Sequence, residues 1–243
     1  MPQVVYGHRG ASGYAPENTL EAFELAAKQG AYGVELDVHL SRDGELVVAH
    51  DETVERVSDG EGWIKDQTLR ELKALHFNKT HPEYADARLP TLAEVYALLK
   101  PYGLHVNVEL KNSLIDYPNL ERRCIELAAQ MGMTERVLYS SFNHHSLLRV
   151  KAIDPKLPCG LLYECSMVHP WEYAQKLQMN ALHPHFSELQ IPGECENAHA
   201  LGLEVNPWTV NEEGDLRMVA QAGADRIITN FPDRALRVLG TLR

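Results

Sequence analysis

The chain has 243 residues, which is enough for one large hydrophobic core, and α/β barrels often reach this size as a single domain. Its 23 Lys and Arg residues stand against 34 Asp and Glu residues, and the formal net charge of -11 opposes a general attraction to nucleic acid or to an anionic membrane. No interior stretch rich in Ser, Gly or Pro marks a linker, so we expect one domain over residues 1–243.

The start of the chain, Met1–Val5, carries no basic segment followed by a hydrophobic one, and no apolar run reaches about 18 residues. We therefore expect a soluble cytoplasmic protein, and the acidic charge adds the expectation of no nucleic-acid partner and no insertion into a membrane. The sequence does not indicate the oligomeric state. The four cysteines show no CxxC spacing, and we expect them to be reduced thiols without an assigned function.

Short apolar segments typical of strands alternate with amphipathic segments typical of helices along most of the chain. The first strand is expected at Val4–Arg9, and the first helix at Thr19–Gln29, with Asn18 or Thr19 as its cap and Gly30 as its stop. Further strands are expected at Gly33–Asp37, Val106–Lys111, Val137–Ser141, Gly160–Tyr163, Ala181–His183, Leu203–Trp208 and Arg226–Thr229. Further helices are expected at Leu120–Met131, His144–Ile153, Trp171–Leu177, Pro192–Leu201, Asp215–Ala222 and Asp233–Leu239. Eight strand–helix units result, which favours a closed, parallel (β/α)8 TIM barrel over an open doubly wound sheet.

One interval is too long for a simple strand–helix crossover. Between the second and third barrel strands lies Ser41–Gly103, where a crossover needs roughly twenty residues. Its end, Thr91–Lys100, supplies the barrel helix, so residues 41–90 form an inserted subdomain. The insertion contains the apolar run Leu46–Asp51, which delivers His50. Insertions at the carboxyl end of a barrel lie where substrates bind, so this one is either a lid that shapes the substrate site or an inert elaboration.

Polar side chains stand near the carboxyl ends of three expected strands. Side chains alternate faces along a strand, so Glu35 and Asp37 point the same way, and so do Glu109 and Lys111. These four and the His8–Arg9 pair can converge on one mouth. Desolvated acids repel one another unless they pair with or coordinate a cation. The pattern therefore predicts a divalent metal ion and a metal enzyme.

Eight short motifs follow one another along the chain: His8-Arg9-Gly10, Pro16-Glu17-Asn18-Thr19, Glu35-Leu36-Asp37-Val38, Asp43-Gly44 leading to His50-Asp51, Glu109-Leu110-Lys111, Ser140-Ser141-Phe142, Trp208-Thr209-Val210-Asn211 and Thr229-Asn230-Phe231-Pro232-Asp233. Together they resemble the glycerophosphodiester phosphodiesterase family, from Val4 to about Arg237. The resemblance implies a barrel with a small insertion and metal-assisted hydrolysis of glycerophosphodiesters to an alcohol and sn-glycerol 3-phosphate. One position departs mildly, because many relatives have aspartate where Asn230 stands, and its role is left open.

Within this resemblance, Glu35, Asp37 and Glu109 match the ligands of one divalent cation. Three carboxylates suit a hard ion, Mg²⁺ or Ca²⁺, better than they suit zinc. Arg9 offers planar bidentate donors and Lys111 a point charge, a common pair for binding phosphate. The alternative interpretations are that one acid is a structural partner of Lys111, or that Arg9 or Lys111 forms a surface ion pair.

His8 and His50 match the two catalytic histidines of the family. An imidazole titrates near neutral pH, so one ring can accept the proton of an attacking hydroxyl while the other protonates the leaving alkoxide. No Ser, Thr or Cys in the motifs is an obvious covalent nucleophile, and the substrate carries a hydroxyl beside its phosphate ester, so we expect a cyclic phosphate intermediate. The sequence does not say which histidine is the base. His183 and His185, two apart at an expected strand end, are further candidates for the mouth.

The resemblance suggests that Trp208 lines the pocket for the glycerol moiety and that Phe142 does likewise, whereas the alternative for both is a buried core aromatic. Asn18 is interpreted first as a helix cap, and Gly10 as a position that relieves backbone crowding rather than one that contacts ligand.

Two other function classes remain open. The first is a barrel lyase similar to phosphatidylinositol-specific phospholipase C or sphingomyelinase D. Such a lyase would release a cyclic phosphate as its final product or act only on lipid surfaces. The acidic, apparently signal-free chain argues against both properties. A non-catalytic phosphate-binding barrel would lack a histidine or an acid of the constellation, and none is missing.

Overall fold

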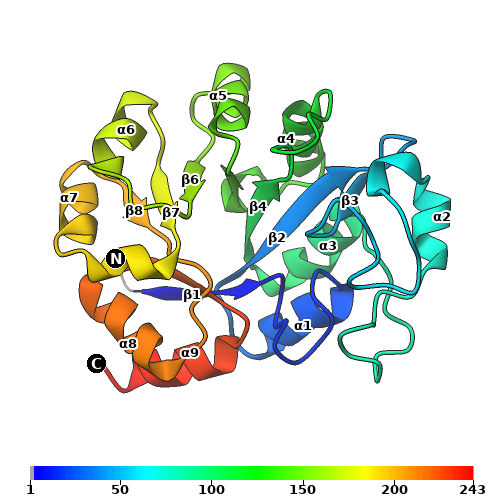
Figure 1. Ribbon diagram of the computed structural model, residues 1–243, viewed down its shortest axis with the longest axis horizontal. Helices are drawn as coiled ribbons and strands as arrows, with labels where there is room; N and C mark the ends of the chain where they lie inside the picture. Colours follow the sequence, from blue (N-terminus) through cyan, green and yellow to red (C-terminus); the bar gives the residue numbers. More distant parts are fainter. Residues whose placement is uncertain (1–2, 243) are drawn as a thin grey trace.

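The computed structural model describes residues 3–242, in which eight parallel strands surround a central axis and helices lie outside them (Figure 1). Neighbouring barrel strands follow the order β8-β7-β6-β5-β4-β2-β1-β9. Backbone bonds from Asp225 N to Val205 O (2.8 Å) and from Val210 N to Ile228 O (2.9 Å) join the two ends of this order. The barrel strands are β1 Val4–His8, β2 Gly33–Leu40, β4 His105–Leu110, β5 Val137–Ser141, β6 Cys159–Tyr163, β7 Ala181–Pro184, β8 Glu204–Val205 and β9 Arg226–Thr229. The predicted TIM barrel is confirmed.

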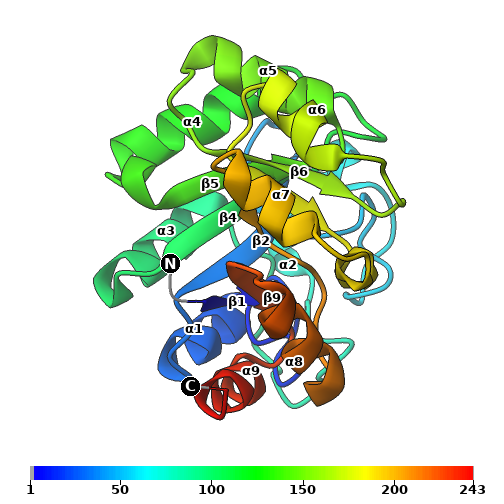
Figure 2. The ribbon, with the colours of Figure 1, turned by 90° about the vertical axis from the view of Figure 1, so that its left-hand side faces the viewer.

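The helices form the outer layer of the barrel, which the view turned by 90° shows around the strands (Figure 2). Their apolar faces join the strands in one continuous core, because a parallel barrel buries both faces of its strands. The helices are α1 Leu20–Lys28, α3 Leu92–Leu99, α4 Leu120–Gln130, α5 His144–Ile153, α6 Pro170–Lys176, α7 Glu194–Ala200, α8 Glu213–Ala222 and α9 Pro232–Gly240, with short 3-10 turns at Ile64–Asp66, Lys100–Tyr102, Thr134–Arg136 and Phe186–Gln190.

The register between β1, β2 and β4 sets the heights of the polar residues. His8 is paired with Glu35, Glu35 with Asn107, and Asp37 with Glu109. Paired residues of parallel strands point to the same side of the sheet, here the inside of the barrel. The predicted convergence at the carboxyl ends of the strands therefore follows from strand pairing.

The chain between β2 and α3 contains β3 (Leu46–Val48) and α2 (Leu69–Ala74), and in Figure 1 β3 lies beside the end of β2 and α2 at the right edge. Strand β3 pairs antiparallel with the end of β2, so the segment continues the barrel sheet beyond the mouth. The segment has a small apolar cluster that is distinct from the core of the barrel. This cluster consists of Val47, Ala49, Val54, Val57, Ile64, Leu72, Phe77 and Leu89.

Strand β8 is shorter than the predicted Leu203–Trp208. Its regular part covers Glu204–Val205, and Pro207 interrupts the ladder because proline has no N–H to donate. The pairing with the β7 side resumes at Trp208, whose N–H donates to Pro184 O at 3.1 Å. Trp208 thus still stands at the carboxyl end of its strand.

The cap of α1 is Thr19, whose hydroxyl accepts a hydrogen bond from Ala22 N at 3.3 Å. The first interpretation of Asn18 as the cap is wrong. Asn18 precedes the cap with a positive φ of 58°, and its amide donates to Asp37 Oδ2 at 2.9 Å instead of to the helix. Asn18 therefore belongs to the polar site described below.

The four cysteines are free thiols. Within residues 3–242, no helix combines the length and the apolar character needed to cross a membrane. Met1 and Pro2, part of the start considered in the sequence, lie outside the described residues.

Candidate active site

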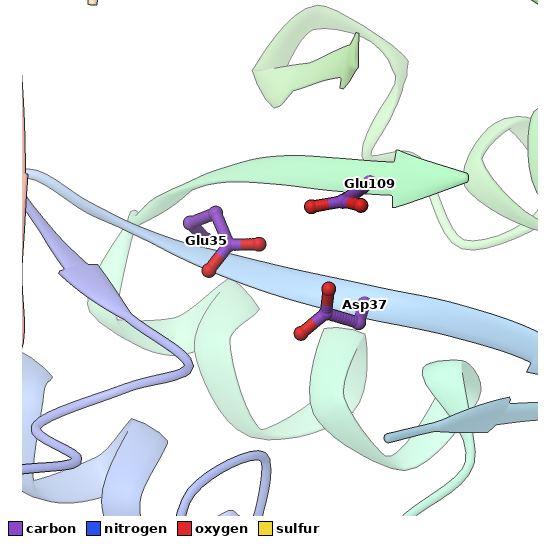
Figure 3. A group of neighbouring side chains, drawn as sticks. All are labelled: Glu35, Asp37 and Glu109. Carbon is purple, nitrogen blue, oxygen red and sulfur yellow. The ribbon is translucent and has the colours of Figure 1, made fainter. Parts of the chain in front are cut away.

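Three acidic side chains meet inside the barrel mouth. Glu35 and Asp37 extend from β2 and Glu109 from β4, and their carboxylates face a common space (Figure 3). One oxygen of each lies within 4.8 Å of the others, and all three residues are buried. The predicted grouping of these acids is confirmed.

Burial and mutual repulsion perturb the acids strongly. Burial raises the pKa of Glu35 well above its usual range, and the charges of Asp37 and Glu109 raise it further. Burial also raises the pKa of Glu109, although Lys111 opposes this shift. For Asp37, the effect of burial is outweighed by nearby positive charge, with Lys111 foremost, so its pKa lies below the usual range. A bound cation would favour the ionised form of all three acids.

The donor set fits a hard divalent ion. It consists of carboxylate oxygens, which Mg²⁺ and Ca²⁺ prefer. Among the described residues, the buried Asp37 Oδ1 accepts no hydrogen bond, and its nearest cation is the Lys111 ammonium at 3.7 Å. The neighbouring Asn18 Oδ1 is also buried without a donor. Unpaired buried oxygens are costly, and a cation would satisfy them.

Arg9 and Lys111 border the acids from two sides. The Arg9 Nε lies 3.5 Å from Asp37 Oδ2, and its Nη1 donates to Glu17 Oε1 at 2.9 Å. The Lys111 ammonium donates to Glu109 Oε1 at 3.0 Å. Both cations are therefore paired with site acids rather than with surface residues. Of the two, Arg9 lines the pocket described below.

A sharp turn after β1 places Arg9. Arg9 has a positive φ of 54°, and its N–H donates both to Glu35 O and to Glu35 Oε2 at 3.0 Å. Gly10 follows with φ 85°, where a Cβ would lie 2.6 Å from the Ala22 backbone carbon. The prediction that Gly10 relieves backbone crowding is confirmed.

His8, the last residue of β1, is held by a neutral partner. Its Nδ1 donates to Asn230 Oδ1 at 2.7 Å, which leaves Nε2 without the proton. Nε2 lies 3.5 Å from Thr209 Oγ1 and 3.9 Å from Glu35 Oε2. Burial, aided by the positive charge of Arg9, lowers the pKa of His8 to about 3. Asn230, whose role the sequence left open, is thus the residue that orients His8.

His50, which follows β3, is held by a charged partner. Its Nδ1 donates to Asp51 Oδ1 at 2.6 Å, and one third of its side chain is exposed. The hydrogen bond from His50 lowers the pKa of Asp51 below its usual range, with a further contribution from Arg56. The sequence offered Asp51 only as a motif residue and gave no sign of Arg56, because that arginine lies in the insertion outside every motif.

A pocket of about 60 Å³ joins these groups. Its lining combines the polar residues His8, Arg9, His50, Glu35 and Glu109 with the apolar residues Phe142, Leu162, Trp208 and Ile228. A larger depression of about 380 Å³ beside α4 has no comparable cluster of acids and histidines among its lining residues. The lining residues therefore identify the smaller pocket as the candidate active site.

The two predicted aromatic residues form one side of this pocket. The rings of Phe142 and Trp208 meet edge to face at 5.5 Å between centroids. Trp208 Nε1 donates to His183 O at 2.8 Å, which fixes the indole in place. Phe142 is 40% exposed, so it is not a core residue.

His183 and His185 do not line the pocket. His183 is buried inside the barrel, where its Nε2 meets Asn206 Nδ2 at 3.0 Å, and its ring fills the space that a side chain at Gly160 would need. The ring of His185 packs edge to face against Trp208, with centroids 5.5 Å apart. Both support the site from outside it.

The fold and this site define the chain as a barrel enzyme whose pocket, at the carboxyl ends of the strands, is lined by carboxylates and imidazoles. The model of the glycerophosphoryl diester phosphodiesterase family matches residues 8–234, and the chain belongs to that family. A glycerophosphodiester phosphodiesterase from Caldanaerobacter subterraneus subsp. tengcongensis is 42% identical over 240 residues, which cover 98% of each chain. Another, from Bacillus altitudinis, is 36% identical over 237 residues, covering 96% of this chain and 97% of the relative. The structure of an Oleispira antarctica phosphodiesterase in complex with the product sn-glycerol 3-phosphate has a TM-score of 0.91 at 32% identity and covers 99% of this chain and 97% of that one.

Proposed function

We propose that this enzyme hydrolyses glycerophosphodiesters to an alcohol and sn-glycerol 3-phosphate in a reaction that depends on a divalent metal ion and on His8 and His50. The observation that carries the proposal is that both imidazoles line one pocket with two acids of the Glu35–Asp37–Glu109 cluster. The product bound to the Oleispira antarctica phosphodiesterase is consistent with this substrate class.

Glu35, Asp37 and Glu109 would hold the ion, Mg²⁺ or Ca²⁺. When bound, it supplies charge that polarises the phosphate and stabilises the transition state. The three ionised acids carry three negative charges, and Arg9 and Lys111 carry two positive ones, which leaves one net negative charge. A divalent ion changes this balance to one net positive charge. The site then complements the single negative charge of a phosphodiester.

Arg9 and Lys111 are proposed to orient the phosphate group. The guanidinium of Arg9 has donors beyond the one used by Glu17, and a planar fork suits two phosphate oxygens. Lys111 adds a point charge from the side of Glu109. Trp208 and Phe142 form the apolar wall against which the carbon skeleton of the glycerol can pack.

The histidines are proposed to move two protons. One ring takes the proton of the substrate hydroxyl beside the phosphate ester, and that oxygen attacks phosphorus. The bond from phosphorus to the alcohol oxygen breaks, and the second ring protonates the departing alcohol. This gives a cyclic phosphate, which water opens with the two proton transfers reversed. The intramolecular attack benefits from proximity, because no second molecule must be ordered.

A product assay with a panel of glycerophosphodiesters tests the proposal. We expect sn-glycerol 3-phosphate as the phosphorylated product, loss of turnover after chelation, and recovery on adding Mg²⁺ or Ca²⁺. Full activity after exhaustive chelation contradicts metal dependence. A cyclic phosphate that accumulates as the final product would indicate a lyase instead.

The ligand set is tested separately from turnover. Glu109→Ala should bind Mg²⁺ or Ca²⁺ more weakly in calorimetry while its circular dichroism spectrum stays that of the folded barrel. Unchanged affinity would remove Glu109 from the ligand set.

A further inference from the structure

Arg56 reaches out of the inserted segment and binds two acids at once. Its Nε donates to Asp51 Oδ2 at 2.6 Å, and its Nη2 lies 3.2 Å from Asp51 Oδ1. On the other edge of the same guanidinium, Nη1 and Nη2 donate to the two carboxylate oxygens of Glu17 at 2.8 and 2.7 Å. Only a planar fork of donors can bind two carboxylates in this way.

Each of these acids is attached to a residue of the pocket. Asp51 Oδ1 accepts the Nδ1 proton of His50, and Glu17 Oε1 accepts a hydrogen bond from Arg9 Nη1. Arg56 therefore connects the loop that carries His50 with the loop after β1 that carries Arg9. These loops are far apart in sequence, and the Glu17–Asp51 link through Arg56 is a direct side-chain bridge between them.

Arg56 does not line the pocket itself. It binds two acids that each hold a residue of the pocket, so it can act on the site through the geometry of those acids. Without Arg56, the Asp51 carboxylate would lose the donors that Arg56 directs at both of its oxygens and could rotate away from His50.

We propose that Arg56 is a positioning residue that holds the His50 imidazole over the pocket by fixing Asp51 against Glu17. The proposal rests on the proposed function, because it takes His50 to be one of the two proton-transfer groups. It adds a role for the insertion: the segment carries the arginine that sets the orientation of a catalytic ring.

Arg56→Met tests the proposal, since it keeps the length and apolar stem of the side chain and removes the donors. We expect kcat to fall by about 10-fold to 100-fold, because misplacing a proton-transfer group costs that much. KM should change less than about twofold, because Arg9 keeps its contacts with Glu17 and Asp37. Arg42→Met is the matched control: Arg42 also lies in the insertion and pairs with an exposed acid, Glu71, at 3.1 Å. It should leave both constants unchanged.

A double-variant cycle with His50→Ala shows whether Arg56 acts through His50. If it does, Arg56→Met should cause no further loss of kcat in the His50→Ala background. A full multiplicative loss there, or wild-type kcat in the single variant, would overturn the proposal. If His50→Ala alone keeps wild-type kcat, the proposed function of His50 fails, and the role of Arg56 fails with it.

If Arg56→Met does not fold, Arg56→Lys is a second variant that tests the same proposal. Lysine retains the charge but cannot bind two carboxylates along two edges, so a folded Arg56→Lys protein should still lose kcat with KM preserved. Wild-type kcat in Arg56→Lys would mean that charge alone suffices and that the fork does not position His50.

Discussion

The two histidines of the pocket differ in what holds them. His8 donates to the neutral amide of Asn230, and burial keeps its ring uncharged, with a pKa lowered to about 3. His50 donates to the ionised carboxylate of Asp51. A ring that is to act as a general base must start without its proton, and His8 meets that condition.

Replacing either ring tests the need for both. We expect His8→Ala and His50→Ala each to lower kcat by about 10²-fold or more, because each removes one proton transfer. Metal affinity should stay at the wild-type value, since neither ring belongs to the acid cluster. His145→Ala is the control, because His145 is exposed on α5. A histidine variant with normal kcat would not be part of the mechanism.

The proposed route through a cyclic phosphate requires a substrate with a hydroxyl beside its phosphate ester. An analogue that lacks the hydroxyl beside the phosphate ester has no internal nucleophile, so we expect no turnover when its products are measured by phosphorus NMR. Binding of this analogue as a competitive inhibitor shows that it reaches the site. Rapid hydrolysis of the deoxy analogue would eliminate the cyclic route and leave direct attack by water.

At the scale of the elements, the segment between β2 and α3 contributes several features to the structure. It carries β3 and α2 around a separate apolar cluster, it delivers His50, and it contributes Arg56. Its proposed role as a lid that shapes the substrate site would make it decide which alcohol group fits.

Replacing residues 52–86 with a short linker tests that role. We expect relative rates across different alcohol headgroups to change more than the thermal midpoint of the barrel does. The linker also removes Arg56, so kcat should fall for every substrate, and Arg56→Met measures this part by itself. Identical relative rates across the panel would mean that the insertion does not shape the site.

At the scale of the whole molecule, the interior of the barrel holds a buried polar pair, His183 and Asn206. His183 is fully enclosed next to Asn206, and burial lowers its pKa to about 3. In the unfolded chain a histidine has a pKa near 6.5. Between these values the unfolded state binds more protons than the folded state. The contribution of His183 to stability is therefore complete above about pH 6.5 and is lost as the pH falls toward 3.

Denaturant unfolding at pH 7 and pH 5 measures this contribution. We expect His183→Gln to reduce the difference in unfolding free energy between the two pH values by about 2 kcal/mol, because the buried ring no longer resists protonation. The variant can differ in stability at pH 7 through packing, and only the pH difference is diagnostic. An unchanged difference would show that His183 is not kept neutral by the fold.

Local patterns in the sequence determined the barrel and the acids of its site. Alternating strand and helix segments predict eight units, and the period of two along a strand brings Glu35, Asp37 and Glu109 to one face. These are short-range properties of the backbone, so the amino-acid sequence alone is sufficient to predict them. The motif order likewise named His8, His50 and Trp208.

Tertiary structure alone decided which side chains hold those groups. Asn18 looked like a cap but donates to Asp37, Asn230 orients His8, and Arg56 joins Glu17 to Asp51. His183, a candidate for the mouth in the sequence, lies buried in the interior of the barrel. Each of these contacts joins elements that are distant in the chain, and their geometry depends on loop paths and on the closure of the barrel. No local propensity encodes such distances, so the sequence indicated the candidate groups of the site and only the fold decided how they are held.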